Sequence, residues 1–218
     1  MEHLDRYLKP TPNIDCDNAA IIEKAQNLTA AKRQTGERAA SLFYFVRDGI
    51  KYNAYRYILA PGYFKASETL SRGDGFCIQK AVLLVALARA VGIPARLFFA
   101  DVQNHFAPQQ MVDWLGMILF THHGYCELYI EGKWVKATPA FDYETCLENR
   151  IIPVEFDGRS DSILHSHNRD GKPHIEYVKL RGHYDDVPLQ EMIDTVIQVY
   201  GPEVAQSCTS GSWIDGCR

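Results

Sequence analysis

The sequence predicts an α+β fold in which helices come first and an antiparallel sheet follows. Over residues 37–50, apolar side chains recur at the three- and four-residue spacing of an amphipathic helix. Residues 76–91 are apolar on nearly every side, which is typical of a helix that is buried all round. From residue 123 the pattern changes to alternation on both sides of a turn at 131–133, which indicates a β-hairpin. Helices followed by strands favour an α+β domain.

The remaining elements are predicted from prolines, caps and shorter patterns. Pro10 and Pro12 exclude a helix near the start, so residues 1–15 are expected to be extended. Asp15 or Asp17 is expected to cap a helix that runs through 21–29. Further expectations are a loop or short extended segment over 52–64, a strand over 95–102, a short helix within 111–119, a strand over 175–180 and an amphipathic helix over 189–200.

The chain of 218 residues has the length of a single domain. We therefore predict one domain over 1–218 with a core at about 39–142. Residues 143–200 are expected to complete the sheet and helices, and 201–218 to form a flexible tail.

Composition excludes several kinds of partner. The chain carries 23 Lys and Arg against 27 Asp and Glu, a net charge of −4, which argues against binding to nucleic acid. The longest apolar run, Ala81–Ala88, is far shorter than the roughly 18 residues of a membrane span. The first residues are polar and do not resemble a signal peptide, so we expect a cytoplasmic protein with no membrane partner.

Cysteine and histidine spacing does not suggest a metal site. The six cysteines contain no CxxC pair and are expected to be mostly thiols: Cys16, Cys77, Cys126, Cys146, Cys208 and Cys217. A group of His105, His165, His167, His174 and Asp161 fits no common zinc spacing, so a solvated loop is the preferred interpretation. We expect no cofactor.

Cys77 is the first candidate for chemistry, because it opens the buried helix directly after Gly73–Phe76. The first N–H groups of a helix are unpaired and carry partial positive charge. They favour a thiolate at this position and can stabilise an oxyanion on a carbonyl that the sulfur attacks. The alternative interpretation is a small, buried apolar cysteine.

His123 is the second candidate, at the start of the first hairpin strand. Alternation places His123, Tyr125 and Glu127 on one face and His122 on the other, so only one of the two histidines is expected to meet Cys77. An imidazole beside the thiol can take its proton and later protonate a leaving amine. A structural or surface histidine is the alternative.

These two regions together resemble the transglutaminase-like superfamily of papain-fold enzymes. The shared pattern is a Thr-Leu pair, a glycine-rich turn, a cysteine that opens a helix, a Gly-Ile-Pro-Ala-Arg exit, and a later strand that begins His-Gly-Tyr. The resemblance covers about residues 39–142, and the matching positions are Thr69, Leu70, Gly75, Cys77, Gly92, Ile93, Pro94, Ala95, Arg96, His123, Gly124, Tyr125, Glu127 and Trp134.

The resemblance implies a papain-like core, in which a helical lobe carrying Cys77 packs on a sheet carrying His123. It also implies thiol-dependent acyl transfer on a peptide or amide substrate, through a thioester that water or an amine resolves. The enzyme would be a cysteine peptidase, an amidase or a transglutaminase-like protein. Substrate contacts are expected at Gly75, Phe76, Gln79 and Tyr125, with a helix-surface role as the alternative for Gln79.

The chain departs from the family at the third catalytic position. The family's aspartate falls at Thr138, just before Pro139, and threonine cannot supply a charge. Asp142 is the nearest replacement, and we predict that it orients His123. Asp157 and Asn149 are the reserves, and a neutral Thr138 hydroxyl could also orient the ring.

Other singled-out residues have mainly structural interpretations. Arg96 is expected to support the turn from the buried helix to the following strand, and Lys80 and Arg89 to lie on the surface or rim. An aromatic group is expected to pack in the core or to line a cleft, with Trp114 as part of a lid: Tyr52, Tyr55, Tyr57, Tyr63 and Phe64.

Two other functions stay open. The order Cys, His, Asp also suits an acyltransferase of the arylamine acetyltransferase type, which would take its acyl group from a thioester cofactor. A non-catalytic binding module with the same fold is the other alternative, and the threonine at position 138 is the feature that favours it.

Overall fold

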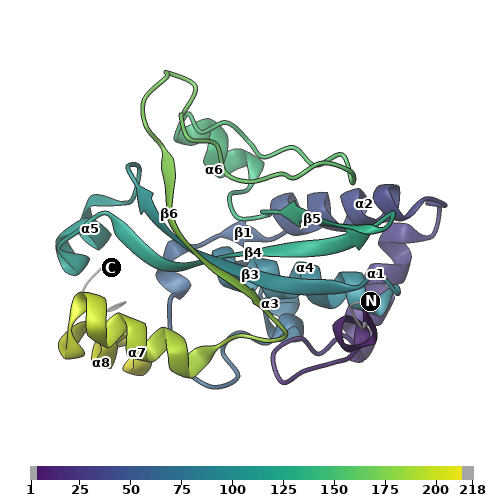
Figure 1. Ribbon diagram of the computed structural model, residues 1–218, viewed down its shortest axis with the longest axis horizontal. Helices are drawn as coiled ribbons and strands as arrows, with labels where there is room; N and C mark the ends of the chain where they lie inside the picture. The colour runs from purple at the N-terminus through teal and green to yellow at the C-terminus, as the bar shows by residue number, and fades with distance from the viewer. Residues whose placement is uncertain (1–3, 213–218) are drawn as a thin grey trace.

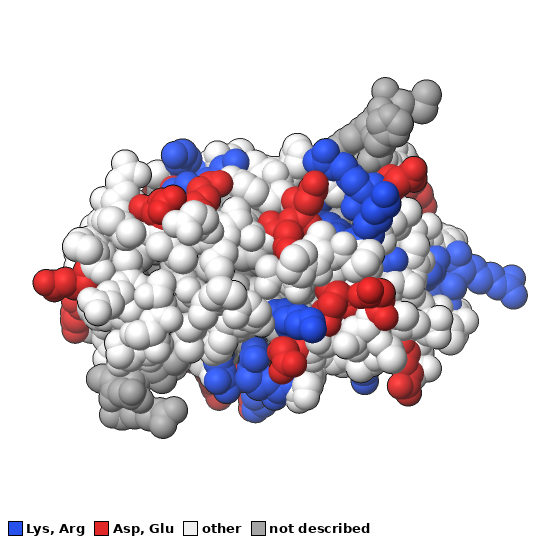
Figure 2. Space-filling view, turned by 90° about the horizontal axis from the view of Figure 1, so that it is seen from below, with Lys and Arg blue, Asp and Glu red and all other residues white. Residues whose placement is uncertain are grey.

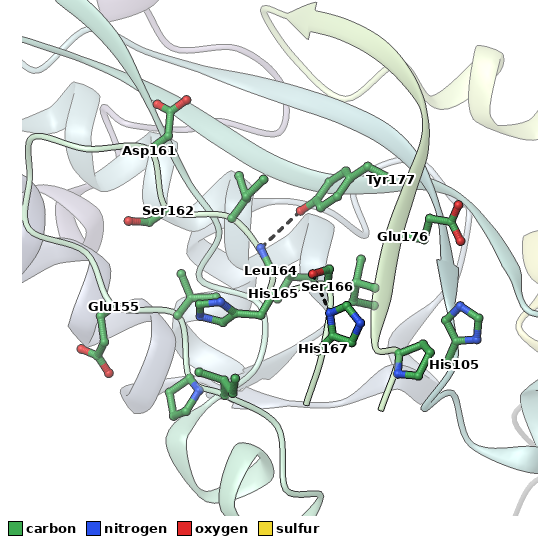
Figure 3. Close-up of a pocket in the computed structure, with 16 residues that line it drawn as sticks. His105, Glu155, Asp161, Ser162, Leu164, His165, Ser166, His167, Glu176 and Tyr177 are labelled. Atoms are coloured by element: carbon green, nitrogen blue, oxygen red, sulfur yellow. Dashed lines mark hydrogen bonds between the residues drawn. The ribbon is translucent and has the colours of Figure 1, made fainter. Parts of the chain in front are cut away.

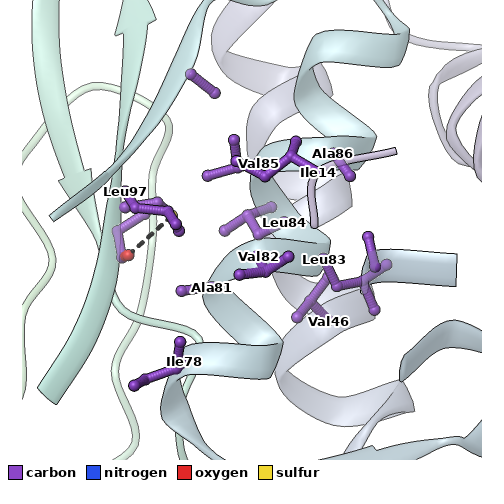
Figure 4. Packing of buried hydrophobic residues seen from close by; sticks show 14 of the residues in the cluster. Ile14, Val46, Ile78, Ala81, Val82, Leu83, Leu84, Val85, Ala86 and Leu97 are labelled. Carbon is purple, nitrogen blue, oxygen red and sulfur yellow. Dashed lines mark hydrogen bonds between the residues drawn. The ribbon is translucent and has the colours of Figure 1, made fainter. Parts of the chain in front are cut away.

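A buried helix, α4 (Cys77–Ala90), lies between a four-stranded sheet and an outer group of helices. The computed structural model describes residues 4–212. Around α4 lie helices α1 (Ala19–Thr29), α2 (Thr35–Gly49) and α3 (Ala66–Arg72). Figure 4 shows the apolar side chains of α4 reaching to the sheet on one side and to the helices on the other. The predicted α+β arrangement is confirmed.

The main sheet is antiparallel, in the order β5-β4-β3-β6. Its strands are β3 (Ala95–Asn104), β4 (Leu119–Ile130), β5 (Lys133–Ala137) and β6 (Ile175–Tyr184). The predicted hairpin is the β4–β5 pair, which runs from Ile130↔Lys133 to Cys126↔Ala137. β5 ends at this pair, whereas residues 119–125 of β4 stay paired with β3. In this part of β4, Gly124 contacts Ile78 at the beginning of α4.

A bulge interrupts β4 next to His123. The pairing with β3 steps from Ala100↔His123 to Val102↔Phe120, so β4 holds one more residue than β3 between these pairs. His122 takes up the difference with a φ of 54°, a left-handed conformation that is uncommon for a residue other than glycine. Bulges re-aim side chains, and this one lies beside the predicted catalytic histidine.

Two charged residues of α4 are buried, contrary to the prediction that they lie on the surface. The Lys80 ammonium donates to the backbone carbonyls of Arg47 (2.9 Å) and Ile50 (2.6 Å). The Arg89 guanidinium donates to the carbonyls of Ala95, Lys9 and Asp185. A buried cation is tolerated when hydrogen bonds replace its water. Lys80 therefore connects α4 to the end of α2, and Arg89 connects it to the segments around Lys9, Ala95 and Asp185. The apolar pattern of one helix does not reveal these contacts.

Short elements complete the fold. They are η1 (Leu4–Leu8), η2 (Ala54–Arg56), α5 (Gln109–Leu115), α6 (Tyr143–Glu148), and a parallel pair of β1 (Lys51–Tyr52) with β2 (Asp74–Gly75). The cap of α1 is Asn18 rather than Asp15 or Asp17. Asp15 instead accepts a hydrogen bond from the Ser67 backbone, at the start of α3.

The C-terminal region is more ordered than predicted. Helices α7 (Leu189–Tyr200) and α8 (Pro202–Ser210) lie side by side at one end of the molecule (Figure 1). The prediction of a flexible tail from residue 201 is wrong for α8, since Cys208 is fully buried and its carbonyl accepts from the Leu59 backbone. Residues 213–218 of that predicted tail, with Cys217, lie outside the described residues.

The surface mixes both signs of charge. On the face shown in Figure 2, Lys and Arg lie among Asp and Glu and do not merge into one basic patch. Within residues 4–212, each helix falls short of the length and apolar character that a bilayer crossing requires.

Candidate active site

Cys77 is the first residue of α4, and the local structure before it explains why the helix begins there. Gly73 ends α3 with a φ of 78°, which glycine adopts without strain. Asp74 and Gly75 then pair with Lys51 and Tyr52, which holds the segment extended up to Phe76. The helix consequently begins at the cysteine.

Cys77 is half-buried, and its thiol lies against backbone N–H groups. The N–H groups of Gly124, Ile78 and Cys77 itself lower its pKa, whereas burial has the larger, opposite effect and raises the pKa to about 11. The sulfur is therefore an uncharged thiol at neutral pH in the absence of substrate, surrounded by donors that would stabilise negative charge.

Asp74 fixes the turn that presents the cysteine. Its carboxylate accepts hydrogen bonds from Asn53 Nδ2 (2.8 Å), Arg56 Nε (3.0 Å) and Arg72 Nε (2.7 Å). These donors lower the pKa of Asp74 against the opposing effect of burial. The glycine-rich pattern of residues 73–76 does not by itself single out Asp74. Its signal was an acid between two glycines, with arginines nearby in the sequence.

Gln79 has a structural role in the same turn, so the expected substrate contact is not what the geometry shows. The side chain is fully buried, Nε2 donates to the Tyr63 carbonyl (3.0 Å), and Oε1 accepts from the Phe76 N–H (3.3 Å). Gly75 is also buried, and a Cβ there would lie 3.1 Å from the Gln79 side chain. Of the predicted contacts around the cysteine, Phe76 borders the cavity described below.

β4 brings His123 to the same place. A Cβ at Gly124 would lie 2.9 Å from the Ile78 Cα, closer than real Cβ atoms come. The residues that follow His123 and Cys77 are therefore in backbone contact, and only glycine allows it. Both predicted catalytic residues border one cavity of about 290 Å³.

The His123 ring is held by other rings. It is buried, and its ring centre lies 6.1 Å from that of Tyr125 and 6.1 Å from that of Tyr177 on β6. Burial lowers its pKa to about 4, so the imidazole is neutral at pH 7. Nε2 has no hydrogen-bond partner within the described part of the chain.

His122 diverges from His123, as alternation predicts, but the bulge keeps both beside the cavity. His122 Nε2 lies 3.3 Å from Glu191 Oε1, and its backbone N–H donates to Asp101. The ring also packs on Phe99, with centres 5.9 Å apart.

Asp142 is not placed to orient His123. Its carboxylate caps α6 by accepting from the Thr145 backbone (2.9 Å), and also accepts from the Thr145 hydroxyl (2.9 Å) and the Tyr52 backbone (2.7 Å). These donors, with the charge of Lys80, lower the pKa of Asp142, against the opposing effect of burial. Among residues 4–212, Asp142 makes no hydrogen bond to His123, and burial alone accounts for the shift in the histidine pKa.

Neither reserve makes a hydrogen bond to the ring among residues 4–212, although Asn149 borders the same cavity as His123. Asp157 holds its own loop through Arg159 and Ser160, and Asn149 donates to the Thr145 carbonyl. Thr138 is buried, and its Oγ1 has no hydrogen-bond partner within the described residues. It lies close to Tyr177, whose pKa burial raises to about 12, and it opposes that rise. Since Tyr177 packs on His123, Thr138 is linked to the histidine through the Tyr177 ring.

The cavity that holds both residues has a wall without formal charge. Among the described residues that border it, none is Asp, Glu, Lys or Arg. Its walls come from the segment 52–57, from β4, from α5 and from the end of α7. The bordering rings are Tyr52, Tyr55, Tyr57, Phe76, Phe106, Trp114, Phe120, Phe141 and Tyr200, with His122, His123 and His174.

The structure thus divides the predicted aromatic group. Tyr52, Tyr55 and Tyr57 border the cavity, as does Trp114 on α5. Phe64 is buried and packs with Phe76 in the core. Tyr125 does not border the cavity and is fully packed, stacked on Phe98 with ring centres 5.0 Å apart.

Arg96 is structural, as predicted. Its guanidinium lies 2.7 Å from Glu127 Oε2, 3.9 Å from the ring centre of Trp134 and 3.2 Å from the hydroxyl of Tyr7. This cluster lies at the opposite end of β3 and β4 from the bulge.

A second, more open hollow lies on the other side of Leu164 and Ile175, which border both spaces. Figure 3 shows its lining, in which Ser166 is bonded to His167 and the Leu164 N–H donates to the Tyr177 hydroxyl. No group of three or more His, Cys, Asp or Glu suited to a metal occurs among residues 4–212. His174, which the sequence analysis placed in a solvated loop, is buried.

Comparisons with known proteins agree with this geometry at the level of the family. The family model described as the transglutaminase-like superfamily matches residues 22–139, just over half of the chain, and the protein belongs to that superfamily. The match ends before Asp142. No curated protein sequence matches the chain.

Solved structures share parts of the fold at low identity. A candidate cysteine protease from Cytophaga hutchinsonii is 15% identical, with a TM-score of 0.48, over 84% of this chain and 55% of its own. A candidate protease from Parabacteroides distasonis is 17% identical, with a TM-score of 0.41, over 62% of this chain and 25% of its own. The chain thus spans about half of the first relative and a quarter of the second.

Proposed function

We propose that the protein transfers acyl groups from amide substrates through Cys77, with His123 as the general base and acid. The observation that carries this is the meeting of a helix-opening thiol, three backbone N–H groups and a neutral imidazole in one cavity. Such an arrangement suits a cysteine peptidase, an amidase or a transglutaminase-like enzyme.

The chemistry begins from an uncharged pair. Burial raises the pKa of the thiol and lowers that of the imidazole, so neither group is charged at rest. The Cys77 proton passes to His123 as the sulfur bonds to the amide carbon, and the carbonyl oxygen becomes an oxyanion. In this proposal, the N–H groups at the α4 N-terminus, which contact the sulfur, stabilise that charge.

The second half of the reaction returns the proton. The C–N bond breaks, the amine leaves with the proton from His123, and the acyl group stays on the sulfur as a thioester. Water or another amine then attacks the thioester, gives its proton to His123, and releases an acid or a new amide. The thiol is restored when that proton returns to the sulfur.

An activated ester tests the acyl-transfer step directly. We expect p-nitrophenyl esters of N-acetyl amino acids to give a burst of p-nitrophenolate and an acyl mass on Cys77. Cys77→Ala should abolish both, and His123→Ala should slow acylation by about 10²–10³-fold. Cys146→Ala is the matched control, since Cys146 is a free, buried thiol on α6.

A non-catalytic binding module is the alternative that one observation favours, namely the absence of an acid beside His123 within residues 4–212. Such a module would give no burst and no acyl mass with any of the esters. That result would overturn the proposed function.

A further inference from the structure

The residues that border the cavity with Cys77 and His123 indicate which acyl groups can bind there. Charged residues make up 23% of the chain, yet none of the described residues that border the cavity is Asp, Glu, Lys or Arg. The acids near the site are occupied elsewhere. Two arginines bind Asp74, and Asp142 caps α6. Asp101 and Glu191, which contact His122, are both paired with Arg181. A charged group that entered this space would lose its water without finding a counter-ion, which is strongly unfavourable.

Rings and neutral hydrogen-bonding atoms replace charge in this wall. Phe106 and Phe141 both pack on His174, with ring centres 5.7 and 5.8 Å away, and Tyr52 packs on Phe141 at 4.7 Å. Aromatic side chains favour a partner that is itself a ring, stacked or edge-on. The volume of about 290 Å³ lies at the small end of ligand cavities, which suits one side chain with its acyl carbon rather than a length of peptide.

His174 is the most exceptional polar group in the wall. It is only 1% exposed, and neither ring nitrogen has a hydrogen-bond partner within the described residues. Burial lowers its pKa to about 4, although the nearby His165 backbone opposes this fall, so the ring is neutral. A neutral imidazole offers one donor and one acceptor. Thr121 Oγ1 and His122 Nδ1, in the same wall, are also buried without partners among residues 4–212.

We propose that the cavity selects an uncharged aromatic acyl group that carries a neutral hydrogen-bonding group, such as a phenolic hydroxyl, and that His174 binds that group. His174 is then a residue that determines specificity and takes no part in the bond changes at Cys77. This inference rests on the proposed function, because it concerns the acyl side of the same site.

The test compares acylation rates of Cys77 by p-nitrophenyl esters of N-acetyl-Tyr, N-acetyl-Phe, N-acetyl-Asp and N-acetyl-Lys. Each rate is divided by that ester's rate with glutathione, which removes intrinsic reactivity. We expect Tyr and Phe esters to exceed Asp and Lys esters by at least about 100-fold, and Tyr to exceed Phe by about fivefold. Equal rates for charged and aromatic esters would overturn the inference while leaving the proposed function standing. If no ester acylates Cys77, the proposed function itself fails.

Variants of His174 isolate its part. His174→Phe should remove the preference for Tyr over Phe, and His174→Gln, which keeps a donor and an acceptor, should retain part of it. His183→Phe, a change on the exposed side of β6, is the matched control. A preference for Tyr that survives His174→Phe would overturn the assignment of His174.

A charge placed in the wall gives a second measurement. Met111 borders the cavity from α5 and is 6% exposed. Met111→Lys should raise the rate of the Asp ester relative to the Phe ester at least about tenfold, because it supplies a counter-ion. Gln109→Lys, on the exposed side of the same helix, should leave the ratio unchanged. An unchanged ratio in a folded Met111→Lys protein would contradict the selection by charge.

Discussion

The cysteine side and the histidine side of the site are built with opposite chemistry. On the cysteine side, Asp74 and Gln79 hold the turn before α4 through charged and amide hydrogen bonds. On the histidine side, His123 is packed by Tyr125 and Tyr177 and has no acid against it within residues 4–212.

The two sides differ in where their charged groups lie relative to the cavity. Charged groups lie outside the cavity, where solvent and counter-ions stabilise them and where they fix the backbone. The reacting thiol and imidazole lie inside, where burial keeps both neutral. Variants that disturb the backbone contact between the two sides should therefore have larger effects than variants of the acids around them.

The largest effect is expected from Gly124, where the two sides touch. Gly124→Val places a Cβ 2.9 Å from the Ile78 Cα, so β4 and the beginning of α4 must separate. A misplacement of about 1 Å costs roughly 100-fold in rate, and we expect at least that loss in Cys77 acylation. The measurement is the p-nitrophenolate burst rate, together with the melting temperature.

Gly49→Ala serves as the control for Gly124→Val. A Cβ there would lie 3.1 Å from the side chain of Phe45, which can shift, and Gly49 ends α2 away from the cavity. If Gly124→Val acylates Cys77 at the rate of Gly49→Ala, the two sides do not depend on this contact.

The next largest effect is expected at Asp74. Asp74→Asn removes the charge that Arg56 and Arg72 share, and the turn before Cys77 loses its anchor. We expect about a tenfold loss in acylation and about 2 kcal/mol of stability, because hydrogen bonds to charged groups are worth roughly this much. Urea unfolding gives the second quantity.

Asp170, an acid on the surface, is the control for Asp74. It tests whether the effect of Asp74→Asn depends on the place of Asp74 in the turn before Cys77. Asp170 also accepts from an arginine, Arg150, but in an exposed pair. Asp170→Asn should change stability by less than about 0.5 kcal/mol and leave acylation unchanged. Equal effects of the two substitutions would show that Asp74 does not act through the turn.

Much of the fold could be predicted because its signals are local. Apolar periodicity located α2, α4, the β4–β5 hairpin and α7, and the family pattern located Cys77 and His123. The errors came from long-range contacts. Lys80 and Arg89 looked like surface charges because their carbonyl partners lie far away in the sequence. Cys208 looked like part of a tail because its packing partners lie in other segments, including Leu59.

The prediction for Asp142 went against a local signal rather than missing a long-range contact. Asp142 is near Thr138 in the sequence, but α6 begins directly after it and uses its carboxylate as a cap. An aspartate before a short polar segment is a typical cap, so the local signal was present and pointed to structure. His174 and Tyr177 were missed as neighbours of the site because they come just before β6 and on it, after a polar, glycine-rich region.

A pH-dependent loss of stability is the next prediction. The folded pKa of His123 and of His174 is about 4, below the ordinary value of 6.5 in the unfolded chain. The unfolded chain therefore binds more protons between these values, so stability is complete above pH 6.5 and falls as the pH drops toward 4. At pH 5 each ring should cost about 2 kcal/mol relative to pH 7.

Urea unfolding at pH 7 and pH 5 measures this loss. His174→Phe should reduce the difference between the two pH values, because it removes one of the two buried rings. His183→Phe, at an exposed position, should leave it as in the wild type. If His174→Phe loses as much stability on acidification as the wild type does, the ring is not held neutral in the folded state.

The smallest effect on the reaction is expected at Asp142, the residue that the sequence favoured as the third catalytic group. Asp142→Asn weakens the cap of α6 and should lower stability by about 1 kcal/mol. Because its carboxylate is occupied by Thr145 and Tyr52, acylation of Cys77 should change by less than about threefold, whereas the acid of a working triad costs about 10⁴-fold. Thr138→Val removes a buried hydroxyl that acts on Tyr177, the ring that packs on His123, and should slow acylation more than Asp142→Asn does. The reverse order, with a shift of the acylation pH profile in Asp142→Asn alone, would restore Asp142 as the partner of the histidine. The predicted order would instead mean that packing and a neutral hydroxyl orient His123, and that the uncharged cavity extends to the third catalytic position.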